Sequence, residues 1–185
     1  MIRLPLSCSL TLLLASGGAL ATFAAAADTA TETKTAAASS TLNKDDTEFV
    51  RMALLGGMTQ LQTSELAIKR GILTGADLEF AKKMVSDHNT VNDELTALAR
   101  TKNVVLPTAL DEKMQKKVDD LGKKSDKDLR EAYLECQVDA HKKAVSAFKS
   151  ASEDAKDGDV KAFAAKHLPH LQQHLETVKA LEKNS

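Results

Sequence analysis

Apolar residues recur every three or four positions along four long stretches of the chain, a spacing typical of amphipathic α-helices. The stretches run from about 46 to 70, 75 to 102, 126 to 156 and 159 to 183. The last stretch has the most regular stripe: Val160, Ala164, His167, Leu171, His174, Val178 and Leu181. Four amphipathic helices of this length predict an all-α protein whose helices pack as a four-helix bundle.

The connections between these helices limit how the bundle is arranged. Loops of a few residues join the first pair and the last pair, so each pair is expected to be antiparallel. The segment 103–125 carries a break at Val104–Pro107 and a short helix that ends at Gly122. It can reach roughly 45 to 50 Å, which matches the roughly 40 Å length of the second helix. We therefore expect a ferritin-like four-helix bundle with a crossover carrying a short extra helix; an up-down-up-down bundle is also compatible.

The N-terminal region has the pattern of an export signal. In residues 1–27, Arg3 precedes a long uncharged stretch that ends in small residues at Ala27. An uncleaved membrane anchor is the alternative, because the uncharged stretch is long enough to span a bilayer. Residues 28–44 are poor in large apolar side chains and predict a disordered linker, which leaves 45–183 as the bundle domain. We expect cleavage of the signal peptide and a periplasmic protein.

The composition narrows the classes of partner. Basic and acidic residues are nearly balanced, 25 against 26, so the chain lacks the basic surface of a nucleic-acid-binding protein. Signal cleavage removes Cys8 and leaves Cys136 alone, so no intramolecular disulfide is expected. Neither nucleic acid nor, after cleavage, an integral membrane segment is expected. An envelope protein or a second copy of this chain is a compatible partner.

The histidines are the strongest candidates for chemistry, because all of them fall in the helical region: His88, His141, His167, His170 and His174. Helical rise places His88 roughly 22 Å from the first loop, and His141 and His174 roughly 24 to 26 Å from the second. These three side chains are therefore expected in one layer near the middle of the bundle. Three imidazoles on three helices suit a transition-metal ion such as zinc, iron or copper.

Four further residues are secondary candidates for the metal site. Asp87 is adjacent to His88 and can orient a ring or supply an oxygen ligand. On the last helix, His167 and His170 share a face with His174, and neighbouring helical histidines can share a metal. Glu65 lies about 10 Å above His88 by helical rise, so it meets His167 only in an up-down-up-down bundle.

Other interpretations of the same residues stay open. A di-iron carboxylate site is disfavoured, because the Glu-x-x-His motif is missing before His88 and His141, where Val85 and Val138 stand. The histidines can instead be structural, in a non-metal helical module that binds envelope partners. An enzyme that uses an open coordination position has the least support.

The order of short segments resembles a known family. Its markers are SELA with Glu65, FAKKMVSDH with Asp87 and His88, DAH with His141, and FAAKHLPHLQQHL with His174. Over roughly 45–182 the chain is similar to an uncharacterised family of bacterial envelope proteins, domain of unknown function 4142, often labelled predicted outer membrane proteins. The resemblance implies a ferritin-like fold and an envelope location, and it suggests a metal site.

Overall fold

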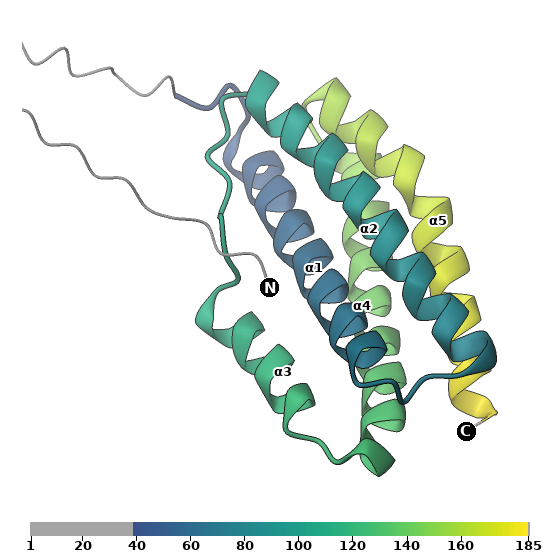
Figure 1. Ribbon diagram of the computed structural model, residues 1–185. Helices are drawn as coiled ribbons and strands as arrows, with labels where there is room; N and C mark the ends of the chain where they lie inside the picture. The colour runs from purple at the N-terminus through teal and green to yellow at the C-terminus, as the bar shows by residue number, and fades with distance from the viewer. Residues whose placement is uncertain (1–38, 185) are drawn as a thin grey trace, which may run out of the picture. The chain divides into compact units, whose positions relative to one another are not determined.

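The computed structural model describes residues 39–184 of the chain. The predicted signal peptide at 1–27 and residues 28–38 of the predicted linker lie outside the described residues. The described part folds into five helices and contains no strand, which confirms the all-α expectation. The helices are α1 (Lys44–Lys69), α2 (Gly75–Thr101), α3 (Glu112–Gly122), α4 (Asp126–Asp154) and α5 (Gly158–Lys183) (Figure 1). None of the helices in 39–184 combines the length and the apolarity that a membrane crossing requires.

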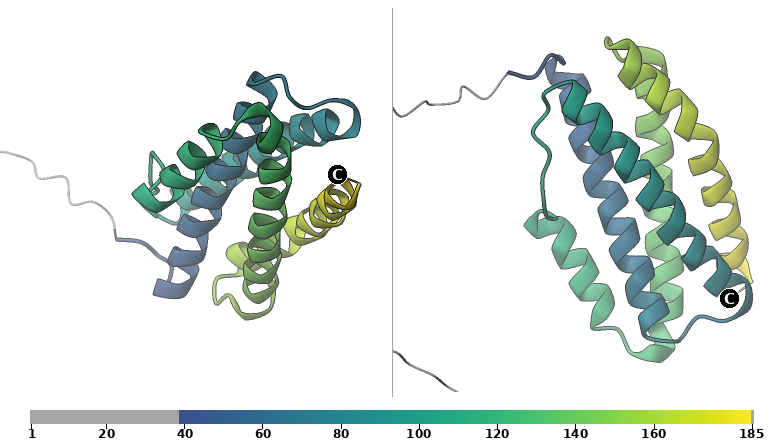
Figure 2. Two further views of the ribbon diagram at one scale, coloured as in Figure 1. Left: turned by 90° about the horizontal axis from the view of Figure 1, so that it is seen from below. Right: turned by 45° about the horizontal axis from the view of Figure 1, so that its top comes forward.

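The four long helices pack as a bundle. α1 and α2 are antiparallel neighbours, as are α4 and α5, while α1 lies beside α4 and α2 beside α5. The segment 102–125, which includes α3, runs back along α1 to the start of α4, so α2 and α4 point in the same direction (Figure 1). This is the expected crossover, and the up-down-up-down alternative is wrong. Figure 2 shows α3 on the outside of α1, on the side away from α5.

A short polar residue precedes each of the five helices, and in four of them its side chain accepts a capping hydrogen bond; Thr74, ahead of α2, makes none. At α4, the Ser125 hydroxyl accepts a hydrogen bond from the backbone N–H of Asp128. At α3, the Asp111 carboxylate accepts one from the backbone N–H of Met114 at 2.7 Å. Such caps satisfy N–H groups that have no partner inside the first helical turn. The local sequence therefore fixes where the crossover helix and α4 begin.

The buried face of α1 differs from the predicted one. Apolar spacing along the first helix predicts a core stripe of Leu54, Met58, Leu61, Glu65 and Ile68. Leu54 is buried as predicted, but Met58, Leu61 and Ile68 are only partly buried. Glu65, on the same predicted stripe, is exposed. The residues buried on α1 are mostly small or polar: Asp46, Val50, Leu54, Leu55, Gly57, Gln60, Thr63, Ser64 and Ala67. Beyond Leu54, small and polar residues occupy the core face, so the apolar spacing identifies the adjacent positions and the predicted stripe is displaced by one residue.

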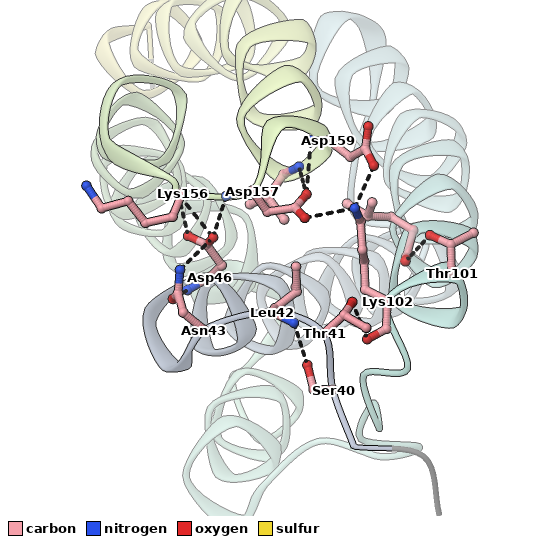
Figure 3. Close-up of polar contacts among 12 residues, drawn as sticks. Ser40, Thr41, Leu42, Asn43, Asp46, Thr101, Lys102, Lys156, Asp157 and Asp159 are labelled. Atoms are coloured by element: carbon pink, nitrogen blue, oxygen red, sulfur yellow. Dashed lines mark hydrogen bonds and ion pairs between the residues drawn. The ribbon is translucent and has the colours of Figure 1, made fainter.

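The first turn of α1 is tied to the loop between α4 and α5. Asp46 is 4% exposed, and its carboxylate accepts hydrogen bonds from the backbone N–H groups of Lys156 at 3.1 Å and Asp157 at 2.8 Å (Figure 3). The side-chain amide of Asn43 donates a further hydrogen bond to the same carboxylate. A buried carboxylate needs such donors to offset its lost hydration. Asp46 therefore fixes the height of α1 against the α4–α5 pair.

The residues that precede α1 also pack against the bundle. The backbone N–H of Thr41 donates to the carbonyl of Lys102 at 2.9 Å, and Leu42 is buried. The ammonium of Lys102 in turn pairs with the carboxylate of Asp157 at 2.8 Å (Figure 3). These contacts join the chain ahead of α1 to the end of α2 and to the α4–α5 loop. The packed part of the chain thus begins ahead of Asp45, inside the stretch predicted as a linker.

Candidate metal centre

Three histidines from three helices meet in the core of the bundle. His88 of α2, His141 of α4 and His174 of α5 are all buried, and one ring nitrogen of each lies within 4.8 Å of the others. Their ring centroids are 5.4 Å apart for His141 and His174, 5.8 Å for His88 and His141, and 6.1 Å for His88 and His174. The layer predicted from helical rise is therefore present. Among the described residues, this is the group of histidine, cysteine and acidic side chains whose geometry suits a metal ion.

Hydrogen bonds to two of the rings leave one nitrogen of each without a partner. Nδ1 of His141 donates to the backbone carbonyl of Gln137 at 2.8 Å, so in the neutral ring Nε2 carries the lone pair. Nε2 of His174 donates to the Asp87 carboxylate at 2.8 Å, which leaves the lone pair on Nδ1. Nε2 of His141, Nδ1 of His174 and Nε2 of His88 are buried and have no hydrogen-bond partner among the described residues. Each of the three rings thus has one buried nitrogen without a hydrogen-bond partner among the described residues.

Burial keeps the three rings neutral. Loss of hydration, together with repulsion by the neighbouring histidines, lowers the pKa of His88 to about 3. Burial lowers the pKa of His141 to about 4, although its hydrogen bond to Gln137 acts in the other direction. Burial also lowers the pKa of His174, against the opposing effect of Asp87. Neutral imidazole is the form that binds metals, so the site is ready for an ion at neutral pH.

Asp87 supports the centre from its edge. Its carboxylate contacts both His174 and the ammonium of Lys83, the latter at 2.8 Å. Partial burial opposes ionisation of this carboxyl, but the hydrogen bonds with Lys83 and His174 hold its pKa below the ordinary value. A carboxylate that accepts from the second nitrogen of a histidine orients the ring and raises its basicity. The structure therefore places Asp87 as a partner of a candidate ligand.

Gln60 of α1 occupies the fourth corner of the histidine layer. Gly57 lies against Asn92 of α2, and one helical turn nearer the α1–α2 loop Gln60 comes level with His88. The amide nitrogen of Gln60 is 3.4 Å from Nδ1 of His141, and its Oε1 is buried with no hydrogen-bond partner among the described residues. Counting residues from the loop between the first two helices predicts Met58, not Gln60, as the residue level with His88. The sequence feature that could have identified Gln60 is the run of small and polar residues around it, because a search for regularly spaced apolar residues passes over them.

A buried polar network connects α1 to the α4 segment that holds His141. The side-chain amide of Gln137 donates to the Thr63 hydroxyl at 3.1 Å. Ser64 and Tyr133 share a hydrogen bond at 3.0 Å between their hydroxyl oxygens. Buried polar groups are stable when they are paired in this way. The network holds in place the turn of α4 whose carbonyl orients the His141 ring.

Three of the secondary candidates lie away from the three-histidine group. Glu65 and His170 are exposed and do not belong to the group, although charge on His170 adds to the lowering of the pKa of His174. His167 is buried, but its Nε2 lies 3.0 Å from the Glu94 carboxylate and its ring packs 4.5 Å from that of Phe163. The crossover places Glu65 and His167 at different ends of the bundle. His167 therefore belongs to an ion-pair and aromatic contact of its own.

Comparison with known proteins agrees with this architecture. The sequence matches the family described as "Domain of unknown function (DUF4142)" over residues 31–181. A solved structure, "Crystal structure of DUF305 fragment from Deinococcus radiodurans", superposes with a TM-score of 0.68 at 12% sequence identity. The superposition covers 78% of this chain and 99% of that one, and at this identity it shows the fold alone. No curated protein matches the sequence.

Proposed function

Because the chain belongs to the DUF4142 family, whose description gives no activity, we propose a function from its own geometry: it binds one transition-metal ion through His88, His141 and His174. One observation carries the proposal: three buried histidines from three helices each bring a ring nitrogen within 4.8 Å of the other two. Each of these rings also has one buried nitrogen without a hydrogen-bond partner among the described residues. A buried polar group without a partner costs about 1 to 3 kcal/mol. A bound cation would satisfy all three nitrogens at once.

The donor set narrows the class of metal. Neutral imidazole nitrogens suit zinc, copper, iron and nickel, whereas magnesium and calcium prefer oxygen ligands. Asp87 behind His174 and the carbonyl of Gln137 behind His141 provide the second layer of contacts that orients metal-binding histidines. Zinc, iron and copper are therefore the ions to be tested first.

The setting we propose for this activity is the bacterial periplasm, which rests on the export signal predicted at 1–27. A metal-binding bundle in that compartment would serve metal handling or protection of the envelope against stress. The export signal supports the location and the histidine site supports metal binding, and the two rest on different residues. A test can therefore disprove the location without disproving metal binding, and the reverse.

The test is the metal content of the mature protein, purified from its native compartment without chelators or a histidine tag. Elemental mass spectrometry should find about one equivalent of a single transition metal per chain. His141→Ala and His174→Ala should lose it, while His170→Ala should keep it, because His170 is exposed on the same helix as His174. Circular dichroism checks that each variant is folded. Equal metal content in folded His141→Ala would overturn the proposal.

The second candidate function is a helical interaction module whose histidines are structural. It is favoured by the fact that two of the rings already have a protein hydrogen bond, from His141 to Gln137 and from His174 to Asp87. This alternative expects no metal above background in the purified protein. It also expects the same thermal stability with and without a chelator.

A further inference from the structure

A groove opens between the first half of α1 and the second half of α4. Its volume is about 760 Å³, within the range of small-molecule sites in proteins. Apolar and small side chains form its walls, among them Phe49 and Ala53 of α1 and Ala144 and Phe148 of α4. The groove is thus large enough for an organic molecule and too apolar to favour a strongly charged one.

The groove ends at the histidine layer. Of the three candidate ligands, only His88 lines it, and the neighbouring polar residue in the lining is Gln60. The histidines come from α2, α4 and α5, so the side of the centre that faces α1 is the side without a histidine. A four-coordinate metal held by three protein ligands keeps one position for another ligand. In an ion held by these three rings, that position would lie towards α1, the side on which Gln60 and His88 line the groove.

Gln60 gives this end of the groove a specific hydrogen-bonding group. Gln60 is only 4% exposed, and its Oε1 is buried with no hydrogen-bond partner among the described residues. Nε2 of His88 is likewise buried and unpartnered. An amide oxygen beside a metal site can accept a hydrogen bond from a ligand that also coordinates the metal. A molecule with one donor group and one coordinating atom would suit this end of the groove.

The rim of the groove carries charges of both signs. Glu48 lies on the α1 side and Lys143 on the α4 side, and both are exposed. A rim of mixed charge does not select for an anion or a cation. The choice of ligand then depends on the apolar walls of the groove and on the polar residues Gln60 and His88 at its inner end.

We propose that this groove is a binding site for an uncharged organic ligand with an apolar body and one nitrogen or oxygen head group. The head coordinates the metal held by the three histidines and donates a hydrogen bond to Oε1 of Gln60. The body lies along the apolar wall that Phe49 and Phe148, whose rings contact each other, form with Ala53 and Ala144. This inference rests on the proposed metal site, because the head group needs the ion. It adds a class of ligand that the three histidines alone do not specify.

The test compares two probes on the cobalt(II)-loaded protein, imidazole and 4-phenylimidazole. Both carry one coordinating nitrogen and one N–H donor, and they differ by an apolar ring. Both should change the visible spectrum of the bound cobalt, and 4-phenylimidazole should bind at least about tenfold more tightly, because its ring leaves water for the apolar groove. Gln60→Leu should retain cobalt and weaken both probes by about two- to tenfold, the effect of one hydrogen bond.

A filled groove provides the matched control. Ala144→Trp places a large ring in the groove and should keep the cobalt content while it abolishes the preference for 4-phenylimidazole. Ala97→Trp, on the exposed face of α2, should leave both affinities unchanged. If the unmodified protein binds cobalt but its spectrum does not change when a probe is added, the ligand site is overturned and the metal site is not. Equal affinities for the two probes would have the same meaning. Failure to bind cobalt would overturn both.

Discussion

The Asp87 carboxylate accepts a hydrogen bond from Nε2 of His174 at 2.8 Å, a contact that joins α2 to α5. It determines which nitrogen of the His174 ring is left for a metal. The carbonyl of Gln137 does the same for His141 at 2.8 Å. Two of the three rings are thus oriented by the protein alone. A site whose ligands are held in advance loses less freedom when it binds an ion.

Removal of the Asp87 carboxylate is predicted to weaken metal binding without abolishing it. Asp87→Ala leaves His174 free to rotate and to change tautomer, so metal affinity should fall about 10- to 100-fold. Competition with a chromophoric chelator measures this change. Asp93→Ala, which removes an exposed carboxylate on the same helix, should keep the original affinity. An unchanged affinity in Asp87→Ala would show that the contact does not act on the metal.

His167 is predicted to contribute to stability and not to metal content. His167→Ala removes the contacts with Glu94 and Phe163, so the free energy of unfolding should fall by about 1 to 3 kcal/mol. The metal content should match that of the unmodified protein. The exposed Glu65 is the control, since Glu65→Ala should alter neither quantity. Loss of metal in folded His167→Ala would place this residue in the site.

The metal-free protein is predicted to lose stability as the pH falls from about 6.5 to about 4. In the folded chain, burial lowers the pKa of His88 to about 3 and of His141 to about 4. In the unfolded chain both rings take up protons near the ordinary pKa of about 6.5. The unfolded state therefore binds more protons in this range, and acid favours it.

Each buried ring should contribute at most about 1.4 kcal/mol per pH unit to this slope. Urea unfolding of the chelator-treated protein at pH 6 and pH 5 measures it. His88→Leu should reduce the dependence of the free energy of unfolding on pH by the contribution of one buried ring. His170→Gln, at an exposed position, should leave that dependence unchanged. The same slope in His88→Leu and in the unmodified protein would contradict a neutral, buried His88.

Neighbouring glycines of α1 are predicted to respond differently to alanine. At Gly56 a Cβ meets nothing within 4 Å, so Gly56→Ala should raise the free energy of unfolding by about 0.5 to 1 kcal/mol through better helix propensity. At Gly57 a Cβ would lie 2.1 Å from Oδ1 of Asn92. The Asn92 side chain must therefore rotate, and Gly57→Ala should give a smaller gain or a loss.

A double-mutant cycle isolates that contact. In an Asn92→Ala background, Gly57→Ala should regain the stabilising effect seen at Gly56. Urea denaturation gives all four free energies, and the coupling should exceed about 0.5 kcal/mol. Additive effects would mean that α1 and α2 do not approach each other at this level, which would also remove the argument that places Gln60 beside His88.

The link between α1 and the α4–α5 loop is predicted to depend on one carboxylate. Asp46→Ala leaves the backbone N–H groups of Lys156 and Asp157 without their acceptor, so stability should fall by about 2 to 3 kcal/mol. Asp45→Ala, at the exposed adjacent position, should change it by less than about 0.5 kcal/mol. Thermal and urea unfolding measure both variants. Similar effects at the two positions would contradict the buried role of Asp46.

Much of this architecture follows from the sequence, because its signals are periodic. Helical rise from two short loops is sufficient to place His88, His141 and His174 in one layer. The length of 103–125 allows a crossover, but the choice of topology depends on tertiary contacts, which a count of residues does not contain. The structure supplies them through the packing of α1 beside α4 and of α2 beside α5.

The errors are concentrated on α1, where the core face is polar. Thr63 and Ser64 are buried with hydrogen-bond partners on α4, and Gln60 is buried beside His141 of the histidine layer. Those partners are distant in sequence, so a pattern of apolar residues identifies the wrong face and brings Glu65 inward. On α5 the predicted stripe is correct for His167 and His174, which are both buried, whereas His170, expected to share their face, is exposed.

X-ray absorption of the zinc-loaded protein tests the central claim most directly, because it counts the ligands of the bound ion. The account predicts three imidazole nitrogens at about 2.0 to 2.1 Å, and two in His141→Ala if that variant still holds zinc. The His170→Ala spectrum should match that of the unmodified protein, since His170 is exposed. A first shell made of oxygen atoms, or an unchanged imidazole count in zinc-loaded His141→Ala, would contradict a metal centre built from His88, His141 and His174.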